Sequence, residues 1–76
     1  MKSQYEAVER AERDEERISV LAEIAESASE VAYRLQHPGL YSVAQVQACK
    51  AELATSIKWA RAMGISQVEI AKAVRS

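Results

Sequence analysis

The sequence has few of the residues that cross-link or ligate in small proteins. Its 76 residues include one cysteine, Cys49, and one histidine, His37, so an internal disulfide is excluded and metal ligands are scarce. Phenylalanine is absent and much of the apolar content is alanine, which buries little area per residue. A chain this short forms one domain, residues 1–76, whose core is marginal alone. We therefore expect a second copy, as a homodimer, or a protein partner to supply extra stability.

A long apolar run is also missing. No stretch of the sequence is long enough to span a bilayer, and the first residues are followed by charged ones rather than by an apolar signal region. The single cysteine suits a reducing compartment. These features predict a cytoplasmic protein with no membrane partner.

Charge is distributed unevenly along the chain, although its formal net value is only −1. Residues 1–37 carry nine acidic and five basic side chains, whereas residues 38–76 carry two acidic and five basic ones. The C-terminal cations are Lys50, Lys58, Arg61, Lys72 and Arg75. These five are the candidate contacts to DNA, if DNA is the partner. Strong DNA-binding domains are usually basic overall, so solubilising charges are the alternative interpretation.

Apolar periodicity predicts one long helix before the only strong breaker, His37-Pro38-Gly39. Proline disfavours a helical conformation in the residue before it, so the helix should end near Gln36. Apolar residues recur every three or four positions in the second half of this segment, at Ile18, Leu21, Ala25, Ala28, Ala32 and Leu35. This spacing predicts an amphipathic helix over about 3–36.

Two further helices are predicted from their capping residues. Ser42 with Gln45 three residues later makes a capping box, and Gly64 suits a left-handed helix end, so a second helix should cover about 43–63. Ser66 and Glu69 repeat the capping pattern before a short third helix, about 67–75. The predicted fold class is therefore all-α: a long helical hairpin with a short third helix, self-associating.

The predicted helix lengths leave part of the first helix uncovered. At about 1.5 Å per residue the first helix is roughly 50 Å long and the second roughly 30 Å, so the second covers only residues 18–36. Residues 1–17 form a charged helical extension, which is either solvated or an arm that docks on a partner. The candidate interface residues are Tyr5, Val8, Ile18, Trp59 and Met63. Trp59 lies off the apolar stripe and either packs under the third helix or anchors an interface.

Reactive groups are not gathered into any recognisable catalytic pattern. Glu23, Glu26 and Glu30 form an acidic ridge, which we interpret as a solvated face because no histidine partner or pocket accompanies it. The alternative is that the ridge opposes a basic partner. His37 is expected to cap the end of the first helix, and Cys49 falls on the apolar stripe as a core residue. The sequence predicts no enzyme, no metal, no cofactor and no small-molecule substrate.

Residues 64–74 read Gly-Ile-Ser-Gln-Val-Glu-Ile-Ala-Lys-Ala-Val. This segment resembles the first helix of the helix-turn-helix in bacterial regulators, Gly-x-Ser-x-x-Glu-Ile-Ala-x-x-Leu. The resemblance implies a regulatory DNA-binding protein, but only Arg75 and Ser76 follow, where the family has its recognition helix. The first hypothesis is a small non-enzymatic regulator related to helix-turn-helix proteins. The alternative is an adaptor or inhibitor that binds a protein, of a size that suits a phage or mobile element.

Overall fold

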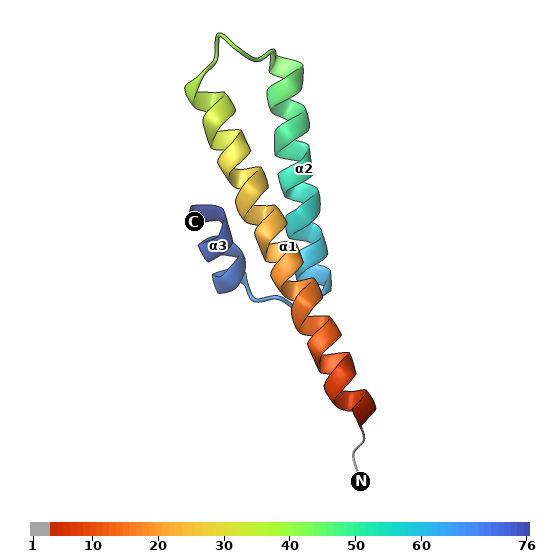
Figure 1. Cartoon of the computed structure of the whole chain (residues 1–76). Helices are drawn as coiled ribbons and strands as arrows, with labels where there is room; N and C mark the ends of the chain where they lie inside the picture. Colours follow the sequence, from red (N-terminus) through yellow and green to blue (C-terminus); the bar gives the residue numbers. More distant parts are fainter. Residues whose placement is uncertain (1–3) are drawn as a thin grey trace.

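The computed structural model describes residues 4–76, and the side chains from residue 12 onward. Over this range the chain is all-helical, with α1 at Gln4–Gln36, α2 at Val43–Ala62 and α3 at Gln67–Arg75 (Figure 1). α1 and α2 form the long antiparallel hairpin, and α3 is the short third helix. The predicted all-α hairpin with a short third helix is confirmed, and over the described residues the helix boundaries agree to within one residue, whereas self-association stays a prediction.

The start of α2 is fixed by the capping box that the sequence predicted. The backbone N–H of Gln45 donates to Ser42 Oγ at 3.1 Å, and the N–H of Ser42 donates to Gln45 Oε1 at 2.8 Å. At the start of α3 only half of this pattern forms, with the Glu69 N–H donating to Ser66 Oγ at 3.2 Å. The Glu69 carboxylate accepts hydrogen bonds from Arg17 of α1 and, at 3.4 Å, from Ser66 Oγ, rather than from the backbone N–H of Ser66.

The end of α2 has the geometry of a Schellman motif. Gly64 has φ +82°, in the left-handed region that residues with a Cβ avoid. Its N–H donates to the carbonyl of Arg61, and the N–H of Ile65 donates to the carbonyl of Ala60, each at 3.0 Å. Ile65 and Ala60 are both buried, so the apolar contact that accompanies this motif is also present.

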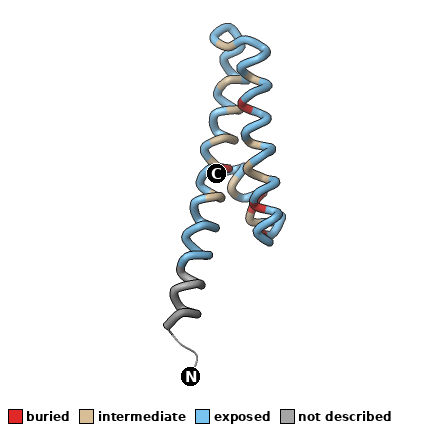
Figure 2. Tube along the Cα trace, turned by 90° about the vertical axis from the view of Figure 1, so that its right-hand side faces the viewer, coloured by how far each residue is buried: buried red, intermediate tan, exposed pale blue. Residues whose placement is uncertain are grey.

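α1 is the central helix, and α2 and α3 pack on different flanks of it (Figure 1). The buried cluster takes one residue from α1, one from α2, one from the linker and one from α3: Ile24, Ala60, Ile65 and Ile70. Ile24 is the one large side chain, among those described, that is fully buried. Figure 2 shows how few positions of the tube are buried. The core is therefore thin, as the alanine-rich composition led us to expect.

The molecule is elongated, with principal extents of 61 × 19 × 16 Å. The C-terminal end of α2 lies beside residues 13–17 of α1. Arg13, Asp14 and Arg17 of α1 line one hollow together with Met63 and Ile65, which follow α2. The earlier turns of α1 extend past the end of α2 (Figure 1). No helix within the described residues has the length and apolar character needed to cross a membrane.

Candidate functional site

The most distinctive surface feature is Trp59, near the C-terminal end of α2. Its side chain is 64% exposed, although tryptophan is the largest apolar residue in the chain. It lines a shallow hollow between α1 and α2 together with Met63, which is 38% exposed, and Val20. The remaining lining residues belong to α1: Glu12, Glu15, Glu16 and Ser19. An accessible tryptophan and methionine at the C-terminal end of α2 therefore lie beside three carboxylates of α1.

A second hollow follows on the same flank of the hairpin, further along α1. Glu23 and Glu26 of α1 face Glu52 of α2 across it. The rest of its lining is small or hydroxylated: Ser27, Ala51, Thr55 and Ser56. Ser56 precedes Trp59 by three residues and Glu23 follows Val20 by three, so the two hollows are neighbours along both helices. Together they carry six carboxylates and no basic side chain.

These positions bear on the sequence-based interpretations of Trp59 and of the acidic ridge. Trp59 does not pack under α3, because its side chain is 64% exposed and the hollow that it lines takes all its residues from α1 and the C-terminal end of α2. The three glutamates of the acidic ridge have different surroundings. Glu23 and Glu26 line the second hollow, whereas Glu30 accepts a hydrogen bond from Arg34 at 3.0 Å.

The other predicted interface residues are placed differently. Ile18 is 68% exposed on α1. It is absent from the lining of both hollows, so it does not join the surface around Trp59 and Met63. Tyr5 and Val8 fall within α1, but their side chains lie outside the described residues.

The five candidate nucleic-acid contacts lie on two helices. Lys50, Lys58 and Arg61 are exposed on α2 and fall within an arc of about 80°, given 3.6 residues per turn. Lys72 and Arg75 are exposed on α3, where Lys72 lines a hollow with Ala22 of α1. The structure thus brings three cations together on one face of α2, with the other two on the helix that flanks α1.

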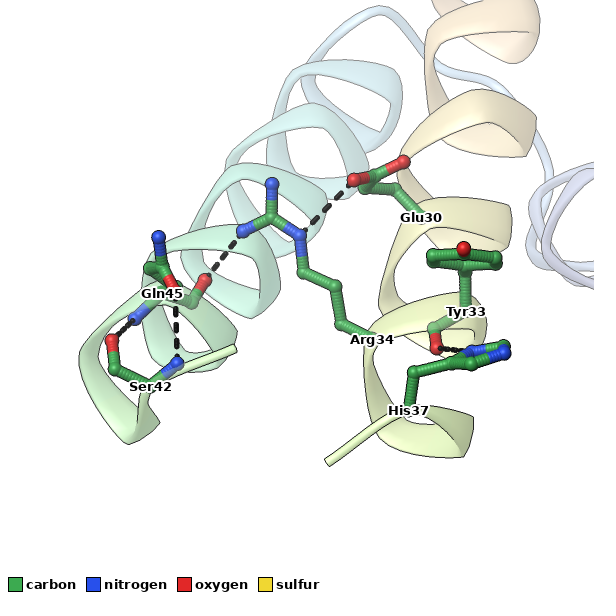
Figure 3. Close-up of polar contacts among 6 residues, drawn as sticks. All are labelled: Glu30, Tyr33, Arg34, His37, Ser42 and Gln45. Carbon is green, nitrogen blue, oxygen red and sulfur yellow. Dashed lines mark hydrogen bonds and ion pairs between the residues drawn. The ribbon is translucent and has the colours of Figure 1, made fainter. Parts of the chain in front are cut away.

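Arg34 connects α1 to the start of α2 at the loop end of the hairpin, a role that was not predicted from the sequence. Its Nε donates to Glu30 Oε1 at 3.0 Å and its Nη1 donates to the backbone carbonyl of Gln45 in α2 at 2.8 Å (Figure 3). Its guanidinium carbon lies 4.9 Å from the ring centroid of Tyr41, a cation–π distance. The hydrogen bond to Glu30 raises the pKa of Arg34. These contacts hold α1 and α2 together, so we assign Arg34 a structural role.

His37 and Cys49 behave as the sequence predicted. His37 Nδ1 lies 2.9 Å from the carbonyl of Tyr33 and must donate to it, because a carbonyl oxygen only accepts (Figure 3). The two rings are stacked with centroids 4.3 Å apart. Cys49 is buried in α2. Within the described part of the chain, no group of three or more potential ligands is placed to hold a metal ion.

Comparisons with protein-family models, curated proteins and solved structures found no match to this chain. The resemblance of residues 64–74 to a helix-turn-helix thus depends on the motif residues themselves. Of these, Gly64 has a positive φ and Ser66 is the N-cap of α3. Function is therefore inferred from the surfaces described above.

Proposed function

We propose that this chain is a non-enzymatic protein-binding module, an adaptor or inhibitor, whose contact surface is the flank of the hairpin around Trp59. The observation that carries the proposal is the exposure of Trp59 beside Met63. Large aromatic residues dominate the binding energy of protein interfaces, and methionine adapts to the shape of a partner. On a chain with so thin a core, leaving this much apolar surface in water is costly unless a partner covers it.

The partner is better explained as a different protein than as a second copy at this surface. A two-fold contact centred on this flank would set glutamates of one copy, such as Glu12, Glu15 and Glu16, near glutamates of the other, because glutamates line both hollows. Like charges facing each other at an interface oppose association. A homodimer, if it forms, would therefore use another surface.

Site-specific photo-crosslinking tests the proposal. A photoreactive phenylalanine analogue replaces Trp59 in the full chain, and the matched control carries it at Val43, which is 79% exposed at the other end of α2. We expect a discrete protein adduct from position 59 in cells that express the chain, and none from position 43. Competition by the unmodified chain should remove the adduct, whereas a Trp59→Ala competitor should not. Equal labelling from both positions would contradict the proposal.

A helix-turn-helix-related DNA-binding function is the second candidate, favoured by one specific feature. α2 ends in the Schellman motif at Gly64 and α3 begins at the Ser66 cap, so the junction matches the scaffold half of that motif. Lys58 and Arg61 are exposed on the adjoining face of α2. This candidate predicts duplex DNA affinity that falls as salt rises and that weakens on Lys58→Glu or Arg61→Glu. Fluorescence anisotropy at low salt is the test, and a flat titration would reject it.

A further inference from the structure

The two hollows on the Trp59 flank make one elongated strip, which we call the acidic strip. It comprises the residues that line both hollows on α1 and α2, from Glu12 to Ser27 along α1. These 15 residue steps correspond to about 22 Å of helix. A partner helix of about 15 residues would match that length if it lay along the strip.

The chemistry of the strip changes along its length. At one end Trp59 and Met63 offer an apolar anchor. Six carboxylates border the strip. Three of them lie beside this anchor, Glu12, Glu15 and Glu16, and three lie in the second hollow, Glu23, Glu26 and Glu52. Within the described part of the chain none of the six takes part in an ion pair, whereas Glu30 and Glu69 are both paired with arginines. In the free chain these carboxylates repel one another, and a cationic partner would relieve that repulsion.

Charge therefore selects the occupant. The six carboxylates of the strip repel an anionic partner such as a nucleic acid, although the cation Lys58 lines a neighbouring hollow with Trp59. A second copy on a two-fold axis centred on the strip sets carboxylates against carboxylates. Lysine and arginine side chains pair with carboxylates and also bind the face of a tryptophan. Amphipathic helices dock in grooves through apolar residues spaced at i, i+3, i+4 and i+7.

We infer that the acidic strip docks a basic amphipathic helix of a partner protein, with its apolar residues on Trp59 and Met63 and its lysines or arginines along the carboxylates. This inference rests on the proposed protein-binding function and narrows it to one class of partner. It assigns Trp59 as the anchor and Glu12, Glu15 and Glu16 as the residues that select charge next to that anchor.

Intrinsic fluorescence tests the inference directly, because Trp59 is the single tryptophan of the chain. The probe is a helix-forming peptide of about 15 residues, made of leucine, lysine and alanine with leucine on one face. Two peptides serve as controls: one with glutamate in place of lysine, and one of the same composition with the leucine face scrambled. We expect a blue shift of the Trp59 emission with the lysine peptide alone, and an affinity that falls with added salt.

Matched variants of the full chain separate the strip from general electrostatic attraction. Glu12→Gln with Glu15→Gln removes two charges from the strip, and Asp14→Asn with Glu30→Gln removes two charges from outside it. We expect the first pair to weaken binding of the lysine peptide by about fivefold or more and the second by less than about twofold, since exposed charge pairs contribute modestly. Circular dichroism should show that the first pair is as well folded as the unmodified chain, because it relieves repulsion.

Three results would overturn the inference. One is equal binding of the glutamate peptide, and another is equal weakening by the two variant pairs. The third is a blue shift with rising protein concentration alone, which would place a second copy on the strip. A protein adduct from position 59 without affinity for the lysine peptide would reject this partner class and leave the protein-binding function in place. If neither a protein adduct from position 59 nor affinity for the lysine peptide is found, both the protein-binding function and the basic-helix partner are rejected.

Discussion

At the scale of single residues, Glu69 connects local and tertiary structure. Its backbone N–H donates to the cap residue Ser66, and its carboxylate accepts a hydrogen bond from Arg17, which is 52 residues away along the chain. The contact with Arg17 is the largest of the interactions that lower the pKa of Glu69 below its ordinary value of 4.5. A carboxyl group with a lowered pKa in the folded state stabilises that state above its unfolded pKa, and the contribution is lost as the pH falls through the folded value.

The pH dependence of thermal unfolding should reveal this contact. We expect Glu69→Gln to lower the Tm at pH 7, and we expect the difference from the unmodified chain to shrink as the pH falls below 4.5. Glu23→Gln is the control, because Glu23 lines the acidic strip and has no ion pair within the described residues. Because this change removes a repelled carboxylate rather than a paired one, Glu23→Gln should not lower the Tm at pH 7. A constant gap for Glu69→Gln down to pH 2–3 would show that the Arg17 contact contributes nothing.

At the scale of helices, the boundaries were predictable because their determinants are local. The cap at Ser42 and the turn at Gly64 depend on partners within five residues along the chain. The breaker at Pro38 acts on its immediate neighbour. Because these interactions join residues that are close along the chain, they can be recognised in the sequence, and the helix boundaries could be predicted from it.

The relative placement of the helices was less predictable, for an equally physical reason. Whether Trp59 faces α3 or the acidic half of α1 depends on the angle at which α3 packs, and periodicity within one helix does not encode it. The same holds for Arg34, whose contact with the Gln45 carbonyl exists only once the hairpin closes. The second capping box is incomplete for the same reason, since the Glu69 carboxylate accepts from Arg17, 52 residues away along the chain, and from the Ser66 hydroxyl rather than from the Ser66 N–H. The sequence named parts of the candidate site, Trp59 and Met63 as interface residues and Glu23 with its neighbours as an acidic ridge, but it did not place them on one flank.

The packing of α3 on α1 can be tested with two apolar residues of the same helix. Ile70 is 5% exposed and belongs to the buried cluster, whereas Val74 is 39% exposed one turn later. We expect Ile70→Ala to reduce the free energy of unfolding by about 2–4 kcal/mol, because the deletion leaves a cavity between α1 and α3. Val74→Ala should cost less than about 1 kcal/mol. Urea denaturation measures both, and similar losses would show that α3 is not anchored through Ile70.

At the scale of the whole molecule, the solvent-accessible surface of the chain is large for its mass. The chain exposes 5995 Å², whereas a compact folded monomer of its 8.4 kDa exposes about 4,600 Å². The excess follows from an elongated hairpin with one fully buried large side chain among the described residues. A single hydrophobic core of this kind supplies few kcal/mol. A partner that covers the acidic strip would therefore contribute a substantial share of the total stability.

This dependence on a partner gives the last prediction. A ligand that binds only the folded state, at a free concentration 100 times its Kd, stabilises it by about 2.7 kcal/mol. For a domain of this size that corresponds to a rise in Tm of about 10–20 °C. We expect the lysine peptide to raise the Tm progressively toward such a value, and the glutamate peptide to leave it unchanged. Trp59→Ala should reduce the rise strongly. Titrating the protein alone is the control: a Tm that does not change with protein concentration leaves the peptide as the source of the added stability, whereas a Tm that climbs would indicate self-association through a surface other than the strip.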